Sequence, residues 1–450
     1  MAKKKQIELT IEEKLQNALV PKEEQPYKIP NNWCWVRLES INKYKSETLN
    51  PKNAMEKMFE LYSVPSFDNK YPEILIGKDI GSNKYIVKKN DILLCKINPR
   101  INRVWQVYQH TNFGQICSSE WIVIRNEILN KSFLRYYFTS EYFRNRLCEN
   151  VSGVGGSLTR AKPKLVQLYE VPLSPINEQQ RIVNIIESLF AKLDRAKELI
   201  ENTLAQFEQN KMAILHKAFT GELTAKWRKE NNIDLSSWEK IKLGKVLLPM
   251  QTKKPTGQFF RYIDIDAIDN KRQIVKAPKL ILTEKAPSRA SRGVETGNIL
   301  FSMVRPYLKN IAQIDSDLSD CIASTGFYVC RCKPELNSRF LYYLFIFDKT
   351  IDYLMQFMKG DNSPSIRKDD LLNMKIDLPT IEEQQEIVNI LDKLLAKYNK
   401  IKNLEQQLEK IELLKKAILA KAFRGELGTN NPDEESAEKL LTEILAEKEN

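Results

Sequence analysis

The sequence is poor in the side chains that build metal centres and disulfide frameworks. It has only two histidines, His110 and His216, and neither lies near a cysteine cluster. Its seven cysteines are an odd number, and the closest pair, Cys330 and Cys332, is separated by one residue in a strand-like run. A zinc site needs several such ligands at short spacing, so the pattern argues against one. Reduced thiols in a cytosolic protein are the simplest interpretation.

Long hydrophobic runs are also missing. No apolar stretch approaches the roughly 20 residues that span a bilayer. The N-terminus, MAKKKQIELT, lacks the apolar core of a signal peptide, so we expect a cytoplasmic protein without a membrane partner. The sequence also has no G-x-x-x-x-G-K-[ST] phosphate loop, which argues against ATP hydrolysis by this chain.

What the chain has instead is length, apolar content and positive charge. Its 450 residues are enough for two or three domains, and 42% are hydrophobic, which is ample for buried cores. The formal net charge is +12. That excess suits a polyanionic partner such as DNA, because each cation that neutralises a phosphate releases a condensed counterion.

Two segments of the chain carry nearly the same sequence. Glu-Gln-Gln followed two residues later by Ile-Val-Asn-Ile begins at Glu178 and again at Glu383, an offset of 383 − 178 = 205 residues. Ala-Phe-x-Gly-Glu-Leu then begins at Ala218 and again at Ala422. The segments before these stretches repeat more loosely, because landmarks are kept while the residues between them differ. The chain therefore contains two copies of one plan.

The two similar segments are predicted to be long helices. Apolar residues recur at steps of four and three from Ile182 to Ile214, and again from Ile387 to Ile418. This heptad pattern is typical of a coiled coil. We expect the helices to pack antiparallel against each other within one chain; pairing with another protein or another copy is the alternative.

Capping signals mark both ends of each predicted helix. Ser174-Pro175 offers an N-cap and a first-turn proline, and Thr380 with Glu383 is the pattern of a capping box. Gly221 and Gly425 stand where a glycine commonly ends a helix.

The segments before the helices mix strand and helix patterns. Short strands are expected at Ile92–Cys95, Trp121–Ile124 and Phe327–Cys330, and buried helices at Phe133–Phe138 and Phe340–Phe345. The fold class is therefore α+β: two mixed α/β domains separated by two long antiparallel coiled-coil helices, with a pseudo-twofold internal repeat. For the polar, acidic tail after Gly428, a docking helix and an unstructured end both stay open.

This order of variable domain, heptad helix, variable domain and heptad helix resembles the specificity subunits of type I restriction-modification systems. The marks of the resemblance are Val171–Gln180 with its counterpart Leu378–Gln385, the two Ala-Phe-x-Gly-Glu-Leu endings, and the entry Pro30–Leu38. It covers nearly the whole chain, from about residue 30 to residue 427.

The resemblance implies a non-catalytic subunit whose two target-recognition domains each read one half of a bipartite, asymmetric DNA sequence. It implies two methyltransferase partners that use S-adenosylmethionine and, in restriction-competent systems, two restriction subunits that use ATP and Mg; this chain itself would hold no cofactor. The helices would act as a ruler for the spacer and as docking surfaces. The expected divisions are an N-terminal extension (1–26), domain 1 (27–175), the central helix (176–224), domain 2 (225–379), the C-terminal helix (380–427) and the tail (428–450).

Two features of the sequence partly match patterns found in catalytic sites. Asn98-Pro99-Arg100 lacks the second proline and the aromatic residue of the Asn-Pro-Pro-Tyr stretch that marks adenine methyltransferases. Asp264, Asp266 and Asp269 form an acidic run, with the first two expected on one strand face. Because no lysine stands nearby in the sequence in the usual nuclease arrangement, we favour a solvated strand edge over a metal site.

Candidate DNA-binding residues lie in three loops that are rich in hydrogen-bond donors. The first is a turn after a predicted strand, with a counterpart in the second domain. The second is the glycine-rich loop Gly153–Ser157 with the cations that follow it, matched by Ser363–Lys368. The third surrounds Pro287. The candidates are Lys96, Asn98, Arg100, Arg103, Arg160, Lys162, Lys164, Arg289, Arg292, Arg305, Lys309, Arg367 and Lys368; the plain alternative for each is a solvated surface side chain.

A different class of protein also fits part of the pattern. A self-associating coiled-coil regulator that binds DNA loosely would explain the heptads and the charge. It would not explain why the segments between the helices are each about 150 residues long and differ from each other.

Overall fold

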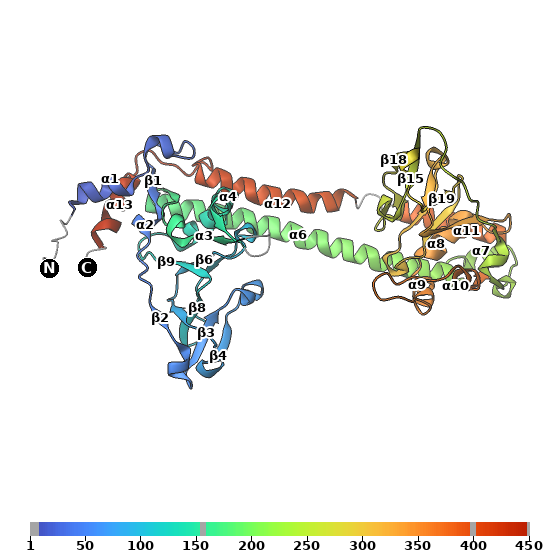
Figure 1. The fold of residues 1–450 in the computed structure, drawn as a ribbon, viewed down its shortest axis with the longest axis horizontal. Coiled ribbons are helices and arrows are strands. Elements are labelled where there is room, and N and C mark those ends of the chain that lie inside the picture. Colours follow the sequence, from blue (N-terminus) through green and yellow to red (C-terminus); the bar gives the residue numbers. More distant parts are fainter. Residues whose placement is uncertain (1–8, 154–158, 397–401, 448–450) are drawn as a thin grey trace. The chain divides into compact units, whose positions relative to one another are not determined.

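The computed structural model describes residues 9–153, 159–396 and 402–447, and divides the chain into two compact units. Unit 1 comprises residues up to Leu199 together with the segment from Gln406 to the C-terminus; unit 2 comprises Ile200–Glu405. The long helix α6 (Ile176–Phe219) begins in unit 1 and ends in unit 2 (Figure 1). Each unit therefore combines one variable domain, the start of the helix that follows it and the end of the other long helix.

Unit 1 is built around two sheets and two ribbons. The central strand of the smaller sheet, β6 (Ile92–Cys95), alternates its side chains between two cores: Ile92 and Leu94 face the helices, while Leu93 and Cys95 face the larger sheet. Burial on both faces explains its uninterrupted apolar sequence. The larger sheet has the strand order β2 (Thr48–Leu49), β5 (Lys84–Ile86), β8 (Gly114–Ser118), β3 (Met58–Tyr62), β4 (Glu73–Ile76). The smaller sheet has the order β7 (Val104–Gln106), β6, β9 (Trp121–Ile124). The ribbons are β1 (Cys34–Arg37) with β12 (Glu170–Leu173) and β10 (Val151–Ser152) with β11 (Arg160–Ala161).

The helices of unit 1 cover one face of the smaller sheet. Helix α3 (Lys131–Thr139) presents Phe133, Tyr137 and Phe138 to the core, as the aromatic pattern predicts. Helix α12 (Lys402–Phe423) runs antiparallel to α6, since Asp194 pairs with Lys415 and Lys197 with Glu412 at 3.0 Å. The remaining helices are α1 (Ile11–Ala18), α2 (Leu38–Ile41), α4 (Glu141–Glu149), α5 (Pro163–Val166) and α13 (Ala437–Ala446). The expected antiparallel helix pair is confirmed.

Unit 2 repeats this plan with different strand numbers. Its central strand β20 (Ile299–Ser302) also faces two cores, with Ile299 and Phe301 toward the helices and Leu300 toward the second sheet. One sheet has the strand order β14 (Leu247–Leu248), β23 (Phe327–Cys332), β20, β21 (Ile311–Gln313). The other sheet has the order β18 (Lys279–Leu282), β15 (Phe259–Ile263), β22 (Ile322–Ser324), β19 (Ala290–Gly293). The ribbons are β13 (Glu239–Lys242) with β24 (Lys375–Leu378) and β16 (Ile268–Asp269) with β17 (Ile274–Val275). Its helices, besides the end of α6, are α7 (Ala225–Glu230), α8 (Ser338–Ile346), α9 (Asp348–Met355), α10 (Lys368–Leu372) and α11 (Ile381–Ala396).

The second heptad segment comprises α11 and α12, and the five residues between them lie outside the described part of the chain. Its predicted capping box forms only in part. The Glu383 amide donates to Thr380 Oγ1 at 3.4 Å, but the Glu383 carboxylate turns into the protein interior. That capping prediction was therefore half wrong, because tertiary donors hold the carboxylate.

A buried carboxylate at the start of each long helix joins three parts of its unit. In unit 1, Glu178 accepts hydrogen bonds from Trp33 Nε1 at 2.7 Å and from Thr429 Oγ1 at 3.0 Å. In unit 2, Glu383 accepts from Trp238 Nε1 at 2.9 Å and from Thr224 Oγ1 at 2.6 Å. The tryptophan comes from the entry to the domain and the threonine from the segment after the other long helix. The repeated glutamate is thus a structural anchor.

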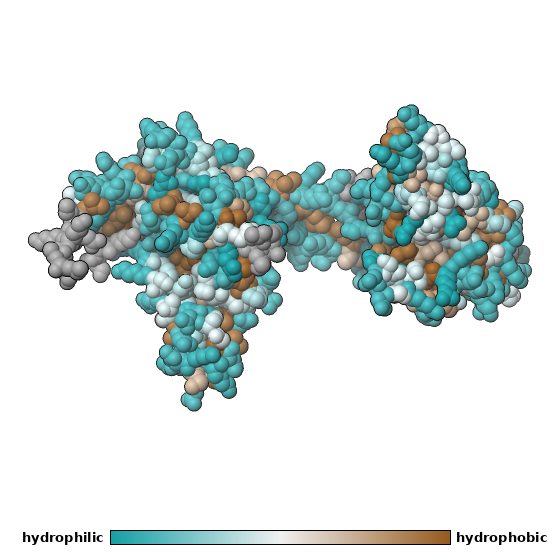
Figure 2. Space-filling view, viewed as in Figure 1, coloured by the Kyte–Doolittle hydropathy of each residue, from teal (hydrophilic) through white to brown (hydrophobic). Residues whose placement is uncertain are grey.

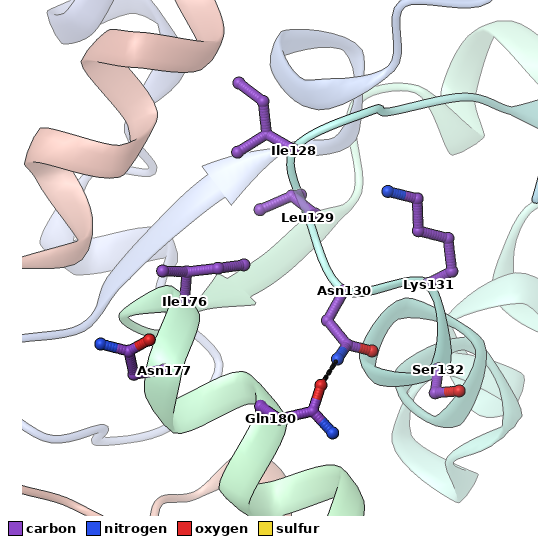
Figure 3. A pocket seen from close by; sticks show the side chains of 8 residues that line it. All are labelled: Ile128, Leu129, Asn130, Lys131, Ser132, Ile176, Asn177 and Gln180. Carbon is purple, nitrogen blue, oxygen red and sulfur yellow. Dashed lines mark hydrogen bonds between the residues drawn. The ribbon is translucent and has the colours of Figure 1, made fainter.

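The two glutamines of the repeated motif fix the domain to its helix. Gln179 Oε1 accepts a hydrogen bond from the Asn130 amide at 3.0 Å. Gln180 Oε1 accepts from Asn130 Nδ2 at 2.8 Å (Figure 3). Asn130 is the N-cap of α3, so this contact orients α3 on the start of α6. Asn337, Gln384 and Gln385 repeat the arrangement in unit 2 at 2.8 and 2.9 Å.

The C-terminal tail is a docked helix. Leu441 and Ile444 of α13 are fully buried in the core of unit 1, beside α1 (Figure 1). Arg181 on α6 donates both terminal nitrogens to the Glu434 carboxylate, at 2.7 and 2.8 Å. Of the two alternatives for the tail, the structure has the docking helix.

Acid should weaken this tail contact. Hydrogen bonds from Arg181 hold the pKa of Glu434 below its ordinary value. A carboxylate with a lowered folded-state pKa contributes stability above its unfolded pKa of about 4.3 and loses it as the pH falls through the folded value. We expect Glu434→Gln to destabilise the tail by no more than about 1 kcal/mol at neutral pH, since the pair is partly exposed, and to have no effect at the lowest pH. Hydrogen exchange of α13 against pH checks this; parallel curves for the two proteins would contradict it.

The glycines that end the long helices adopt the conformation the sequence predicts. Gly425 has φ +73°, and a Cβ built on it would lie 2.3 Å from Pro30 Cγ. Gly428 has φ +72°, but a Cβ there would meet nothing within 4 Å. Gly428→Ala should therefore cost only the left-handed strain, about 1 kcal/mol, and Gly425→Ala about 1–3 kcal/mol more. Denaturant unfolding of unit 1 checks the difference, and equal costs would contradict it.

None of the helices in residues 9–153, 159–396 and 402–447 combines the length and the apolar character that crossing a membrane requires. Hydrophilic residues cover most of the face drawn in Figure 2.

Candidate nucleic-acid interface

A strained turn follows the central strand of unit 1. Asn98 and Asn102 both adopt left-handed backbone conformations, with φ +48° and +52°, and flank the single 3₁₀ turn Pro99–Ile101. Asparagine tolerates this region better than most residues do. Asn102 Nδ2 also donates to the carbonyl oxygens of Phe138 and Thr139 at 3.1 Å, which ties the turn to the end of α3.

The same turn follows the central strand of unit 2, with different residues. Arg305 and Lys309 have φ +48° and +49° and flank the 3₁₀ turn Pro306–Leu308. The left-handed backbone conformation costs a residue with a long cationic side chain about 1 kcal/mol or more of conformational free energy, and costs asparagine less. The geometry is thus retained although the side chains that occupy it differ between the units.

Backbone hydrogen bonds join this turn to the second candidate loop in unit 1. The Asn98 amide donates to the Thr159 carbonyl at 2.8 Å, and the Ala161 amide donates to the Lys96 carbonyl at 2.8 Å. The Lys96 amide in turn donates to the Glu120 carbonyl at 3.0 Å. Candidates that are about 60 residues apart in sequence therefore share one edge of the unit.

Unit 2 joins its candidate loops in the same way. The Arg305 amide donates to the Pro364 carbonyl at 2.8 Å, and the Ile366 amide to the Met303 carbonyl at 3.0 Å. Arg289 is connected through its carbonyl, which accepts from the Thr325 amide at 2.8 Å, next to the Gly326 carbonyl that accepts from Met303. All three loops proposed from the sequence meet here.

The structure sorts the candidate cations by their availability to a ligand. Seven are exposed and, within the described residues, form no ion pair with a carboxylate: Arg100, Lys162, Lys164, Arg289, Arg305, Arg367 and Lys368. Arg305 additionally donates to the Asn362 carbonyl at 2.8 Å, which steadies its side chain over the loop. These seven are the cations best placed to meet phosphates or base edges.

The other candidates are held by the protein or are half-buried. Arg160 pairs with Glu120 at 3.3 Å, and Lys309 pairs with Asp348. Lys96, Asn98, Arg103 and Arg292 are half-buried. Asn98 Oδ1, Arg103 Nε and Arg292 Nε are buried without a hydrogen-bond partner among the described residues. Buried polar atoms in folded proteins usually have a hydrogen-bond partner, which is the protein itself or an ordered water. Atoms without a protein partner are therefore unusual.

Exposed apolar residues, which were not among the candidates predicted from the sequence, lie at the tip of each turn. Ile101 in unit 1 is 50% exposed, and Tyr307 and Leu308 in unit 2 are 42% and 38% exposed. Apolar side chains flanked by cations can contact the thymine methyl group in the major groove or wedge against bases. In the sequence, these apolar residues could have been found because each stands within two positions of a proline in a basic segment.

Of the glycine-rich loop Gly153–Ser157, only Gly153 is described, with φ +112°; Val154–Leu158 lie outside the described residues. The expected approach of its backbone to phosphates therefore stays a prediction.

Asp264 and Asp266 do not share a strand face, because Asp264 precedes the 3₁₀ turn Ile265–Ala267 and Asp266 lies within it, whereas Asp269 ends the short strand β16. Asp264 caps a short 3₁₀ turn by accepting from the Ala267 amide at 3.1 Å, and Asp269 accepts from the amides of Lys271 and Arg272. Asp264 also pairs with Lys279, a lysine 15 residues further along the chain that β18 brings close through the fold. Within the described part, no group of three or more His, Cys, Asp or Glu side chains is arranged to hold a metal ion.

All seven cysteines are free thiols. Burial raises the pKa of Cys332 to about 12 and that of Cys321 to about 11. These thiols therefore stay protonated and unreactive near neutral pH.

Comparison with known proteins shows which family shares this duplicated sequence. The chain matches the family described as "Type I restriction modification DNA specificity domain" twice, over residues 30–206 and 238–413. It is 24% identical to the type I restriction enzyme EcoDI specificity subunit of Escherichia coli, covering 94% of this chain and 96% of that protein. It is also 24% identical to the EcoKI specificity subunit of Escherichia coli strain K12, covering 83% and 84%.

Solved structures share the fold. One comes from work on complex assembly and conformational transition of a type I restriction-modification system; it is 23% identical, has a TM-score of 0.70, and the match covers 89% of this chain and all of that one. The HsdS subunit of Thermoanaerobacter tengcongensis is 24% identical, with a TM-score of 0.54, 90% coverage of this chain and all of that one. Since the duplicated family match spans most of the residues, the chain belongs to the family of DNA specificity subunits of type I restriction-modification systems.

Proposed function

We propose that each unit reads one half of a bipartite DNA target through its strained basic turn and the loops joined to that turn. Target-recognition domain 1 would comprise residues 27–175 and domain 2 residues 225–379, with the long helices setting the spacer. The carrying observation is that both units build the same left-handed, 3₁₀, left-handed turn from different side chains. A constant frame with variable donors is what reading two different words requires.

The differences between the turns are differences in recognition chemistry. Unit 1 presents Arg100 and Ile101, whereas unit 2 presents Arg305, Tyr307 and Leu308. Arginine favours guanine O6 and N7, and apolar side chains, which differ in size and shape between the two turns, contact the thymine methyl group. The half-sites should therefore differ, and the whole target should be asymmetric.

As a specificity subunit, the chain is the non-catalytic member of its complex. We propose that it binds double-stranded DNA together with two methyltransferase subunits, which would supply S-adenosylmethionine and the methylation chemistry. In a restriction-competent system two restriction subunits would add ATP- and Mg-dependent activity. The complex would act in the cytoplasm.

The test is to co-express the chain with the methyltransferase subunit of its own system and map methylated adenines across the host genome. We expect a bipartite, asymmetric motif. Exchanging residues 30–170 for those of a relative should change one half of the motif and leave the other half and the spacer unchanged. A stable complex that methylates nothing, or an exchange that alters both halves, would contradict the proposal.

The alternative of a self-associating regulator finds less support. A regulator of that kind does not require two domains built on the same fold. It would purify as a homodimer without a methyltransferase. Analytical ultracentrifugation of the chain alone and with the methyltransferase distinguishes the two.

A further inference from the structure

Each unit opens with an antiparallel ribbon, and the two ribbons share one register. Cys34 pairs with Leu173 in unit 1, and Glu239 pairs with Leu378 in unit 2, 205 residues later on both strands. Burial of the two ribbons differs sharply. Every residue of β1 and β12 except the half-buried Arg37 is buried, whereas β13 has no buried residue and β24 alternates between exposed and buried. Among the residues that the structure describes, the ribbon is covered in unit 1 and largely exposed in unit 2.

The cover in unit 1 is the N-terminal segment. Leu19 forms an isolated antiparallel bridge with Val36, and the Val20 amide donates to the Trp35 carbonyl at 2.9 Å. Further along, Trp35 Nε1 donates to the Tyr27 carbonyl at 3.2 Å. The segment therefore extends the outer edge of β1 and then crosses the exposed face of the ribbon. In unit 2, β24 is the strand that pairs with β13 within the described residues, and no further strand of that part of the chain adds to its other edge.

Tyr27 is the anchor of this segment. Its ring meets Trp35 edge-on at 4.9 Å between centroids and Tyr142 at 5.5 Å. The guanidinium carbon of Arg424 lies 5.4 Å from the centroid of the same ring. Three elements, β1, α4 and the end of α12, thus form a socket for one aromatic side chain.

The counterparts of the three socket residues line one open groove in unit 2. Lys240 takes the place of Trp35 in the ribbon, Lys349 takes the place of Tyr142 as the second residue of its helix, and Thr220 takes the place of Arg424 after the long helix. All three border a groove of about 610 Å³. Its apolar lining includes Phe219, Trp238, Leu344, Phe347, Tyr353 and Ile376. The groove therefore occupies the position in unit 2 that corresponds to the Tyr27 socket of unit 1.

The rim of the groove is positively charged. Lys240, Lys349 and Lys375 border it, against one carboxylate, Asp377. His216 Nε2 lies 3.2 Å from Lys349 Nζ at the same rim. In unit 1 the covering segment brings Glu24 to Arg37, and the ribbon position of Arg37 is held by Lys242 in unit 2. An acidic occupant would neutralise the lysines at the rim, and it would give Lys242 an ion pair equivalent to the one between Arg37 and Glu24 in unit 1.

We propose that the groove beside β13 is a docking site for an acidic segment of a partner protein that carries an aromatic anchor, with the chemistry that Leu19–Tyr27 has in unit 1. The segment would add its backbone to the free edge of β13 and insert the aromatic ring over Phe219 and Phe347. Its carboxylates would meet Lys240, Lys242 and Lys349. The proposal concerns protein assembly and does not depend on how either unit reads DNA.

A labelled peptide with the sequence of Leu19–Tyr27, which carries two glutamates and one lysine, tests the proposal against the full chain by fluorescence anisotropy. We expect saturable binding that weakens about tenfold or more when Lys240→Glu and Lys349→Glu are combined, because both cations face the ligand. The peptide with Tyr27→Ala should lose affinity to a similar extent. The control protein, Lys271→Glu with Lys285→Glu, changes the net charge equally at exposed positions of unit 2 outside the groove and should bind as the parent does.

Three results would overturn the proposal. The first is absence of saturable binding, and the second is an equal loss in the groove and control variants. The third is a concentration-dependent dimer of the chain that Tyr27→Ala in the chain abolishes, which would assign the groove to a second copy and not to a partner protein. All the substituted lysines are exposed, so the variants keep the core intact.

Discussion

A chain with Arg100→Ala, Lys162→Ala and Lys164→Ala is expected to bind its DNA target on the order of 100-fold more weakly at moderate salt. The three side chains are exposed, and the backbone hydrogen bonds between the Lys96–Asn98 and Thr159–Ala161 segments hold them along one edge of unit 1. Each lost contact should cost on the order of 1 kcal/mol, and each lost phosphate contact should lower the salt slope by about 0.9. Affinity and salt dependence therefore fall together.

Titrating labelled target DNA at several salt concentrations measures both quantities. The matched variant in unit 2 combines Arg289→Ala, Arg305→Ala and Arg367→Ala, and we expect a similar loss with relaxed preference in the other half-site. The control combines Lys22→Ala, Lys28→Ala and Lys52→Ala, which removes three exposed charges from unit 1 away from the turn. An equal effect in control and test proteins would reduce the interface to net charge alone.

Assembly provides the second control for this prediction. None of the substituted side chains lies in the contact between α6 and α12 or in the glutamate anchors. The variants should therefore still form the complex with the methyltransferase, and a variant that fails to assemble would point to a scaffolding role for these loops.

Much of the architecture was predictable because it depends on local and periodic signals. The heptads from Ile182 and Ile387 predict long helices, and apolar runs such as Ile92–Cys95 predict strands with both faces buried. Gly221 and Gly425 could be assigned as helix ends, since only a glycine accepts their backbone conformation without strain. The duplication then required the same fold twice.

The candidate site was predictable only as a list of residues. Sequence could not show that Arg305 and Pro364 lie side by side, because that contact joins segments about 60 residues apart. It also could not separate Lys309, which pairs with Asp348, from Arg305, which is exposed. For the same reason Glu383 was assigned to its local cap, whereas donors from elsewhere in unit 2 hold its carboxylate.

Those donors differ between the two anchors in a way that predicts unequal stability effects. Around Glu383 the partners include Arg228, whose Nη1 donates at 2.6 Å from a buried position. Around Glu178 the corresponding partners are neutral: Trp33, Thr429 and Asn430, with the asparagine at 3.0 Å. Removing Glu383 leaves a buried guanidinium uncompensated, whereas removing Glu178 leaves only neutral donors unsatisfied.

We therefore expect Glu383→Ala to destabilise unit 2 by about 3–5 kcal/mol, and Glu178→Ala to destabilise unit 1 by about 1–3 kcal/mol. Denaturant unfolding followed by hydrogen exchange mass spectrometry assigns each loss to its unit. Replacing the charged pair together, as Glu383→Gln with Arg228→Met, should recover a large part of the loss, since it leaves no buried charge without a partner. If the single and double variants were equally unstable, or if the two glutamates cost the same, the charge of Arg228 would not be the cause. A loosened unit 2 should also cost the complex one half of its DNA target while the other half is still read.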